Sequence, residues 1–244
     1  MKLKEEAQLV RLHKFIADCG FASRRKAEDF IRWGEVTVNG QVVKEMGYKI
    51  LPGKDHVKVK NKLLRPTTKS LYILLNKPIG VVTTLNDPEK RTTVKDLLFG
   101  VKERVFPIGR LDYESEGLLI LTNDGEYAQQ VIHPTKKVKK VYHVKVRGKP
   151  EQKHIERLKQ GVTLAEGRAK AVHIERMGTN ENHDWFKVVL TEGKNRQIRR
   201  MFEKVGFDVL KLKRVAIGRL TLGGLNRGEF KFLTKEQAEL ALKS

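Results

Sequence analysis

The chain has 244 residues, which is enough for one large or two unequal domains with a buried core. Lys and Arg number 50 against 29 Asp and Glu, so the formal net charge at pH 7 is +21. The basic residues are spread through the chain, which excludes a disordered basic tail as their source and favours a polyanionic partner such as nucleic acid.

The single cysteine, Cys19, excludes an intrachain disulfide framework and a multi-cysteine zinc site, and it is typical of a protein in a reducing compartment. No run of about 18 apolar residues occurs. The N-terminal stretch MKLKEEAQLVRLHKF has acids where a secretory signal has an apolar run. We therefore expect a cytoplasmic protein with no membrane span and no membrane partner.

Residues 9–60 are expected to form a small helix-hairpin domain. Apolar residues recur at helical spacing from Leu9 to Ala17, and Ser23 is a suitable N-cap for a second helix. In VTVNGQVV, Asn39-Gly40 lies between alternating apolar residues and predicts a tight hairpin turn. A further short strand is expected around Val57.

Residues 61–69 have no clear period and contain a proline, so we expect a linker there. Residues 70–244 alternate strand and helix patterns without a regular βαβ rhythm, which predicts an α+β domain with a mixed, mostly antiparallel sheet. The expected strands lie in SLYILLNKP, GVVTT, GLLILTND, KVYHVKVRG, DWFKVVLTE, DVLKLKR and GRLTLGG, and the expected helices in EYAQQVI, PEQKHIERLKQ, NRQIRRMFEKV and TKEQAELALK.

A polar run, GRLDYESEG, separates two apolar segments and contains Asp112, Glu114 and Glu116. A carboxylate on a loop between strands is suited to catalysis, but the same residue types commonly serve as turn and capping residues. The pattern alone leaves both roles open, and it does not choose among the three acids.

Arg196, Arg199 and Arg200 crowd the start of the amphipathic helix expected in NRQIRRMFEKV. Cations at a helix N-terminus oppose the helix dipole, so their placement is locally unfavourable. Either they form a solvated charged face, or one arginine turns onto a buried carboxylate while its neighbours bind phosphate.

The segment HPTKKVKKVYHVKVRGK carries seven Lys or Arg from Lys136 to Lys149 and no acid, a stripe that suits phosphate groups. Tyr142 within it is either a core residue or a platform for a stacked base. The histidines are scattered singly and no phosphate-binding loop is present, so the residues predict neither a metal site nor a nucleotide-binding loop.

The segment GRLDYESEGLLILTNDGE resembles the pseudouridine synthases of the RsuA and RluB type, which isomerise specific uridines in ribosomal RNA. LLNKPIGVVTT, KVYHVKVRG, EGKNRQIRRMFEKVGF and VLKLKRVAIGRLTLGGLNRGEF match this family in order, so the resemblance covers about Ser70 to Thr234. The N-terminal VRLHKFIADCGFASRRKAEDFIRWGEVTVNGQVV resembles the small alpha-L RNA-binding module of these enzymes.

By this resemblance, Asp112 matches the catalytic aspartate, Arg199 the basic residue paired with it, and Tyr142 the aromatic residue against the target base. Arg110 matches a residue that helps to displace the uridine, and Leu212 is similar to an apolar residue beneath the base. Further RNA-binding residues are expected in the basic segments: Lys140, Arg196 and Arg200 in the catalytic domain, and Arg24, Arg25, Lys26 and Arg32 in the N-terminal module.

The resemblance implies a monomeric, cofactor-free isomerase that acts on a flipped-out uridine of a ribosomal RNA stem-loop, in free RNA or pre-ribosomal particles, with the large subunit favoured. Small-subunit RNA and a tRNA side activity are alternatives that use the same chemistry. Two other classes stay open: a noncatalytic RNA-binding factor of ribosome assembly, and a metal-dependent nuclease that uses Asp112 with Glu114 or Glu116.

Overall fold

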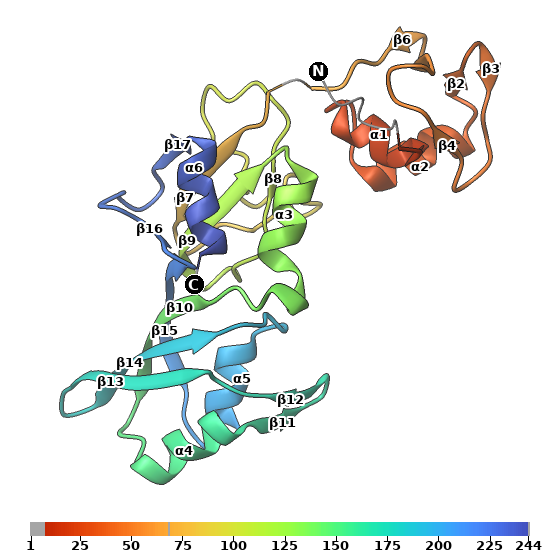
Figure 1. The fold of residues 1–244 in the computed structure, drawn as a ribbon. Coiled ribbons are helices and arrows are strands. Elements are labelled where there is room, and N and C mark those ends of the chain that lie inside the picture. Colours follow the sequence, from red (N-terminus) through yellow and green to blue (C-terminus); the bar gives the residue numbers. More distant parts are fainter. Residues whose placement is uncertain (1–7, 68, 244) are drawn as a thin grey trace, which may run out of the picture. The chain divides into compact units, whose positions relative to one another are not determined.

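A computed structural model describes residues 8–67 and 69–243 of the chain (Figure 1). The chain divides into two compact units. The first comprises the residues up to Ser70 together with Lys102–Val105, and the second comprises Leu71–Val101 and the residues from Phe106 onward. Each unit has its own hydrophobic core.

The first unit consists of two helices and short strands, as its pattern predicts. The helices are α1 (Leu12–Asp18) and α2 (Arg24–Arg32), the pair β1 (Val10–Arg11) and β4 (Lys49–Ile50) is antiparallel, and a second sheet has the order β3 (Gln41–Val42), β2 (Val36–Val38), β5 (Val57–Val59), β6 (Lys62–Leu63). Ser23 Oγ accepts the backbone N–H of Lys26 at 3.1 Å, which confirms the expected cap. Asn39 has φ +52° and connects β2 to β3 through the predicted hairpin.

Two expectations for this unit are corrected. The first helix begins at Leu12 rather than at Leu9, because Val10 pairs with Ile50 in a strand and Leu9 is 59 % exposed. The expected linker at 61–69 contains β6, and Leu64 is buried in the core of this unit, so its first residues are folded structure.

The second unit is built on one twisted sheet, mostly antiparallel, as predicted (Figure 1). Among the described residues its strands follow the spatial order β13 (His173–Thr179), β14 (His183–Leu190), β10 (Lys140–Arg147), β15 (Val209–Ile217), β9 (Glu116–Thr122), β7 (Tyr72–Lys77) and β17 (Phe230–Leu233), with β8 (Phe106–Pro107) beside β9 and β16 (Leu220–Thr221) beside β15. The contact between β15 and β9 is parallel, and the other paired strands of this sheet are antiparallel.

Helices cover the two halves of this sheet with separate cores. Helix α4 (Gln152–Gln160) and helix α5 (Gln197–Glu203) pack with β14 and β10, and a small hairpin of β11 (Val162–Leu164) and β12 (Gly167–Ala169) joins this core. Helix α3 (Gly125–Ile132), α6 (Lys235–Glu239) and the short 3₁₀ helix Leu240–Leu242 pack with β7 and β9, and a second 3₁₀ turn, Pro134–Lys136, follows α3.

Gly117 is required where β9 meets β15. It has φ +109°, and a Cβ at this position would lie 2.2 Å from the carbonyl oxygen of Arg214. A side chain would therefore push the two central strands apart, so the glycine after the acidic loop is a packing requirement.

Two strand predictions for this unit fail. The segment GVVTT forms only an isolated bridge between Val82 and Thr93, because Gly80 has φ +81° and the chain turns there. GRLTLGG gives only the two-residue β16. Strands β13, β17 and the β11–β12 hairpin were not expected, and β13 lacks alternation because it is an exposed edge strand in which only Ile174 is buried.

Within the described ranges, each helix is too short or too polar to cross a lipid bilayer.

Candidate active site

A pocket of about 350 Å³ lies in the second unit, where the two helix-covered halves of the sheet meet. Its floor is one face of β14, β10 and β15, and it presents Lys140, Tyr142, Leu190, Leu212, Arg214 and Ile217. One wall is the loop 109–115, which leads into β9, and the opposite wall is the turn 192–197, which leads into α5. The end of α3 contributes Val131 and Ile132.

Asp112 lies on the loop wall and is partly buried. The backbone N–H of Ser115 donates to the carbonyl oxygen of Asp112 at 3.0 Å, which closes a turn in this loop. Among the described residues this carboxylate makes no hydrogen bond or ion pair. The other acid of the pocket, Glu192, accepts from Gln197 at 2.6 Å and faces Lys194, so Asp112 is the pocket carboxylate that is available to a ligand.

A buried lysine donates hydrogen bonds to the loop that contains Asp112. Lys77, at the end of β7, is fully buried, and its Nζ donates to the carbonyl oxygens of Asp112 at 3.2 Å and Ser115 at 2.8 Å. Nζ also donates to Pro78 at 2.9 Å. Burial lowers the pKa of Lys77 to about 8, although the nearby charges of Asp112 and Glu116 act in the opposite direction.

Residues that follow Lys77 in the chain also donate hydrogen bonds to this loop. Thr83 Oγ1 donates to the carbonyl oxygen of Leu111 at 2.6 Å, and the backbone N–H of Gly80 donates to Tyr113 at 2.9 Å. The segment LLNKPIGVVTT therefore positions the loop of Asp112 through hydrogen bonds to the backbone carbonyl oxygens of that loop. The sequence analysis did not identify Lys77 as a functional residue. The feature that could have identified it is a lysine at the end of a mostly apolar strand.

Arg199 reaches the loop wall from α5, but its direct partner is Glu114. Its guanidinium donates to the carbonyl oxygen of Val209 at 2.8 Å and to that of Glu114 at 3.1 Å, and its Nε lies 3.9 Å from the Glu114 carboxylate. Burial lowers the pKa of Arg199, while the charges of Glu114 and Asp112 raise it. The structure thus places Arg199 within electrostatic range of Asp112 without the expected direct pair, because its two terminal nitrogens donate to the carbonyl oxygens of Val209 and Glu114, and its Nε is buried without a hydrogen-bond partner among the described residues.

The other acids of the loop have structural partners. Glu114 also lies 3.3 Å from Arg196, and both of these side chains are exposed. Glu116 is buried and lies 2.8 Å from Arg227. Neither glutamate lines the pocket, which separates them from Asp112.

Tyr142 and Leu212 lie on the pocket floor, as a role against a base requires. Tyr142 is 8 % exposed and Leu212 is 6 % exposed, and both belong to the core shared with α4 and α5. The tyrosine is therefore both a core residue and a pocket residue.

The remaining basic residues divide between the pocket and the surrounding structure. Arg110 is exposed at the rim, and Lys140 is partly buried on the floor. Arg196 lines the pocket with φ +45° at the N-cap of α5. Arg200 does not line it, because its guanidinium donates to both carboxylate oxygens of Glu166, at 2.8 and 2.5 Å.

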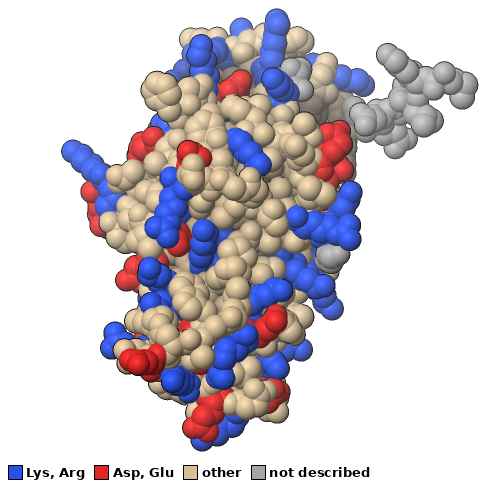
Figure 2. All heavy atoms as spheres, turned by 90° about the vertical axis from the view of Figure 1, so that its left-hand side faces the viewer, with Lys and Arg blue, Asp and Glu red and all other residues tan. Residues whose placement is uncertain are grey.

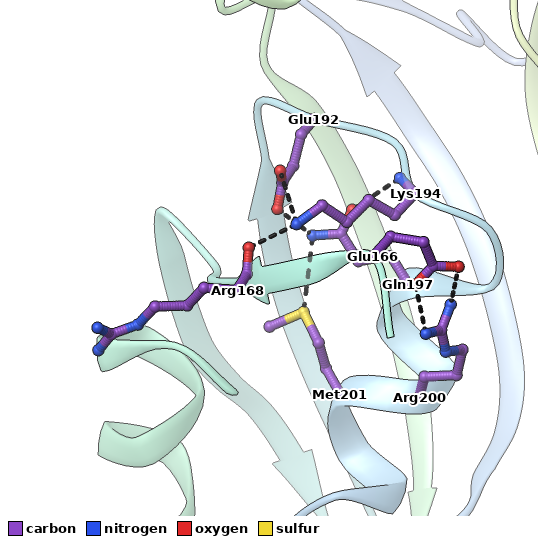
Figure 3. A network of polar contacts seen from close by, with 7 residues as sticks. All are labelled: Glu166, Arg168, Glu192, Lys194, Gln197, Arg200 and Met201. Atoms are coloured by element: carbon purple, nitrogen blue, oxygen red, sulfur yellow. Dashed lines mark hydrogen bonds and ion pairs between the residues drawn. The ribbon is translucent and has the colours of Figure 1, made fainter. Parts of the chain in front are cut away.

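Figure 3 shows the polar network that supports the turn 192–197. Gln197 is buried, donates to Glu192 at 2.6 Å and accepts the backbone N–H of Lys194 at 3.0 Å. Lys194 Nζ donates to the carbonyl oxygen of Arg168, and Arg200 joins Glu166 to the carbonyl oxygen of Asn195 at 3.0 Å. The network ties this pocket wall to the β11–β12 hairpin (Figure 3).

In the first unit, Arg24, Arg25, Lys26 and Arg32 are exposed on α2. Lys26 Nζ lies 4.2 Å from the centroid of the Trp33 ring, which gives this surface an aromatic component. Across the face drawn in Figure 2, Lys and Arg side chains recur over most of the surface, with Asp and Glu between them. In the part of the chain that the structure describes, no group of three or more His, Cys, Asp or Glu is arranged to hold a metal ion.

Comparison with known proteins identifies the class. The family model for RNA pseudouridylate synthase matches residues 71–204, and the S4 domain model matches residues 10–56. The chain therefore belongs to the RNA pseudouridylate synthase family. It is an isomerase of the RsuA and RluB type, in which an S4 RNA-binding domain precedes the synthase domain.

Among its relatives, an uncharacterized RNA pseudouridine synthase of Aquifex aeolicus (strain VF5) is 44 % identical over 233 residues, covering 95 % of this chain and 92 % of that protein. The ribosomal large subunit pseudouridine synthase B of Bacillus subtilis (strain 168) is 42 % identical over 231 residues, covering 94 % of each. A crystal structure of a pseudouridylate synthase has a TM-score of 0.67 at 27 % identity, covering 95 % of this chain and 99 % of that one.

Proposed function

We propose that this enzyme converts one specific uridine of ribosomal RNA, in the large subunit, to pseudouridine. The observation that carries the proposal is Asp112, a pocket carboxylate without a side-chain partner among the described residues, on a loop fixed by the buried Lys77. The large-subunit substrate is supported by the relative of Bacillus subtilis, which is named for that activity.

The reaction requires a carboxylate that acts on the sugar. The bond between uracil N1 and ribose C1′ breaks, the base turns while it is held, and C5 forms the new bond to C1′. Asp112 serves either as a nucleophile or as a base on the ribose, and in both roles it must be ionised. The guanidinium of Arg199 lies within electrostatic range of Asp112 and contributes positive charge to this side of the pocket, where it also interacts with Glu114.

A base must leave its helix before it can enter this pocket. Unstacking costs a few kcal/mol, which contacts with phosphate groups and with the pocket floor must offset. Arg110 and Arg196 at the pocket wall are exposed and can contact phosphate, Arg196 in exchange for its exposed ion pair with Glu114, and Tyr142 with Leu212 offers an apolar floor for the extruded uracil. We propose a folded stem-loop, in free RNA or in a pre-ribosomal particle, as the substrate of a cytoplasmic monomer that needs no cofactor.

The other functions receive less support from the site. A nuclease with two or more acids on one metal would need Glu114 or Glu116 beside Asp112, but neither glutamate lines the pocket and both are paired with arginines. A noncatalytic RNA-binding factor would not need a carboxylate without a partner in a pocket. Small-subunit RNA or tRNA as substrate would use the same residues, so the experiment has to separate these substrates.

The test is incubation of the purified enzyme with separate transcripts of large-subunit RNA, small-subunit RNA and tRNA. Pseudouridine is mapped after carbodiimide modification, with and without a chelator. We expect one modified uridine in large-subunit RNA, no strand cleavage, and no effect of the chelator. Modification of small-subunit RNA or tRNA alone would contradict the substrate assignment. Intact RNA without pseudouridine would favour the noncatalytic factor.

A further inference from the structure

The pocket floor carries two positive side chains side by side. Lys140 precedes Tyr142 by two residues on β10, so both side chains share one face of the strand. Tyr142 pairs with Arg214 across the β10–β15 ladder, which brings Arg214 to the same face. The charge of Arg214 acts directly on Lys140.

Neither cation has an acidic partner among the described residues. Arg214 is 5 % exposed, and its Nε donates to the carbonyl oxygen of Leu118 at 2.8 Å, but its Nη2 is buried without a hydrogen-bond partner. In the described ranges Lys140 makes no hydrogen bond and no ion pair. Unpartnered buried donors are rare in native proteins, so this arrangement calls for a ligand that supplies the missing acceptor.

The acids of the pocket do not neutralise the floor. Glu192 is engaged by Gln197 and Lys194, and Asp112 lies on the wall with Arg199 and Lys77 in its field. Burial, followed by the charge of Arg214, lowers the pKa of Lys140 to about 8. Two like charges in a poorly solvated site destabilise one another, and an incoming anion relieves this repulsion.

The proposed isomerisation, on which this inference rests, creates such an anion. When the N1–C1′ bond breaks, both electrons stay with the base, which becomes a uracil anion whose charge spreads over N1 and the two carbonyl oxygens. The loss of these electrons leaves C1′ electron-deficient. The Asp112 carboxylate compensates either by bonding to C1′ or by taking a proton from C2′. After rotation, C5 bonds to C1′, Asp112 is released or returns its proton, and the hydrogen of C5 leaves as a proton while N1 gains one.

We infer that Lys140 and Arg214 form the counter-charge for the uracil anion, with Lys140 as a catalytic residue and Arg214 as the buried charge behind it. A backbone phosphate is the alternative anion. The floor favours the base, because Lys140 and Arg214 flank Tyr142 and Leu212, whereas Arg110 and Arg196 are exposed where phosphates would approach.

The test compares Lys140→Met and Lys140→Arg with wild type under single-turnover conditions. The probe is a large-subunit ribosomal RNA transcript with tritium at C5 of its uridines, and tritium release reports the completed reaction. Lys170→Met is the matched control, since Lys170 is exposed, lies outside the basic segment 136–149 and does not line the pocket. We expect Lys140→Met to lower the rate constant roughly 100-fold with RNA affinity within about threefold, and Lys140→Arg to recover most of the rate.

A second arm separates charge stabilisation from a general structural role. In transcripts with 5-fluorouridine the base is a better leaving anion, so its departure depends less on a counter-charge. Loss of the fluorouridine is measured by nucleoside analysis. We expect the defect of Lys140→Met to shrink at least fivefold on this substrate, by the same reasoning about charge that develops in the transition state.

An equal defect on both substrates would contradict the inference. So would weaker RNA binding with an unchanged rate constant, because that pattern indicates a phosphate contact. A wild-type enzyme that releases no tritium contradicts the proposed function itself. An active wild type with an equally active Lys140→Met contradicts only the role of the cation pair.

Discussion

Lys77 and Asp112 lie next to one another at the loop before β9, but their side chains have different environments. Lys77 is fully buried and donates to three carbonyl oxygens, whereas the carboxylate of Asp112 has no partner among the described residues. A buried ammonium group is stable only when its N–H groups donate hydrogen bonds. The loop therefore has to keep the conformation that supplies acceptors to Lys77. The rigid backbone then presents Asp112 to the pocket at low entropic cost on substrate binding.

The first prediction concerns Lys77→Met. The carbonyl oxygens of Asp112 and Ser115 would lose their donor inside the protein, and part of that loss is offset because a buried charge is removed. We expect the free energy of unfolding to fall by about 2 kcal/mol, measured by urea denaturation. Lys139→Met, an exposed neighbour in sequence of the pocket lysine, should be neutral, and an equally stable Lys77→Met would refute the role of this contact.

The second prediction concerns pH. Lys140 has a pKa lowered to about 8, so its charge is present below that pH and is lost as the pH rises through it. The single-turnover rate should therefore fall above pH 8. In Lys140→Arg most of the decrease in rate should occur at higher pH than in wild type. Any decrease that remains near pH 8 should reflect deprotonation of Lys77, whose pKa is also about 8. A rate that keeps rising from pH 8 to pH 9.5 in wild type would argue against the counter-charge.

At the scale of elements, helix α5 and the β11–β12 hairpin act as one support for a pocket wall. Arg200 from α5 bonds Glu166 at the hairpin, and Lys194 from the turn bonds the carbonyl oxygen of Arg168 (Figure 3). The hydrogen bonds from Arg200 lower the pKa of Glu166 to about 2, so this pair remains charged well below neutral pH. Arg196, in the same segment, lines the pocket and forms an exposed ion pair with Glu114 at 3.3 Å.

The third prediction separates these two arginines. Arg196→Gln should reduce the dependence of log affinity on log salt by roughly 0.7 to 0.9, the value for one lost phosphate contact. Arg200→Gln should leave this slope unchanged and lower the single-turnover rate, because the turn loses its support. Binding titrations at several salt concentrations measure the slope. Equal slopes for the two variants would contradict the division between an RNA contact and a structural pair.

Elements with a clear pattern were predictable, and elements defined by their neighbours were not. Strand β7 is buried on both faces, so its sequence is a continuous apolar run. Strand β10 is buried on one face, so apolar and polar residues alternate along it. The exposed edge strand β13 has no such pattern, so its existence depends on pairing with β14. Likewise Asp112 and Tyr142 were predicted as site residues from the family resemblance of their motifs, and both line the pocket, whereas Arg214 joins the pocket through its register with β10.

At the scale of the whole molecule, the charge of +21 is divided between two folded units. The first unit exposes Arg24 and Arg25 at the start of α2, and the second unit holds the pocket. Such a division is consistent with an RNA-binding domain that supplies affinity and a catalytic domain that supplies chemistry.

The fourth prediction tests this division with the double variant Arg24→Gln/Arg25→Gln. We expect weaker RNA binding and a salt slope reduced by roughly 1.5, with the rate constant at saturating enzyme unchanged, because these residues belong to the other unit. The double variant Arg24→Lys/Arg25→Lys keeps both charges and should keep the slope. A loss of rate at saturation in the Gln variant would show that the first unit takes part in the chemical step.

The most direct test of the whole account is pseudouridine formation by Asp112→Asn on large-subunit ribosomal RNA. Its control is Glu181→Gln, an exposed acid outside the pocket. We expect Asp112→Asn to form no pseudouridine while it binds the RNA within a few-fold of wild type, and Glu181→Gln to be fully active. Turnover by Asp112→Asn at the wild-type rate would show that the chemistry does not depend on this carboxylate.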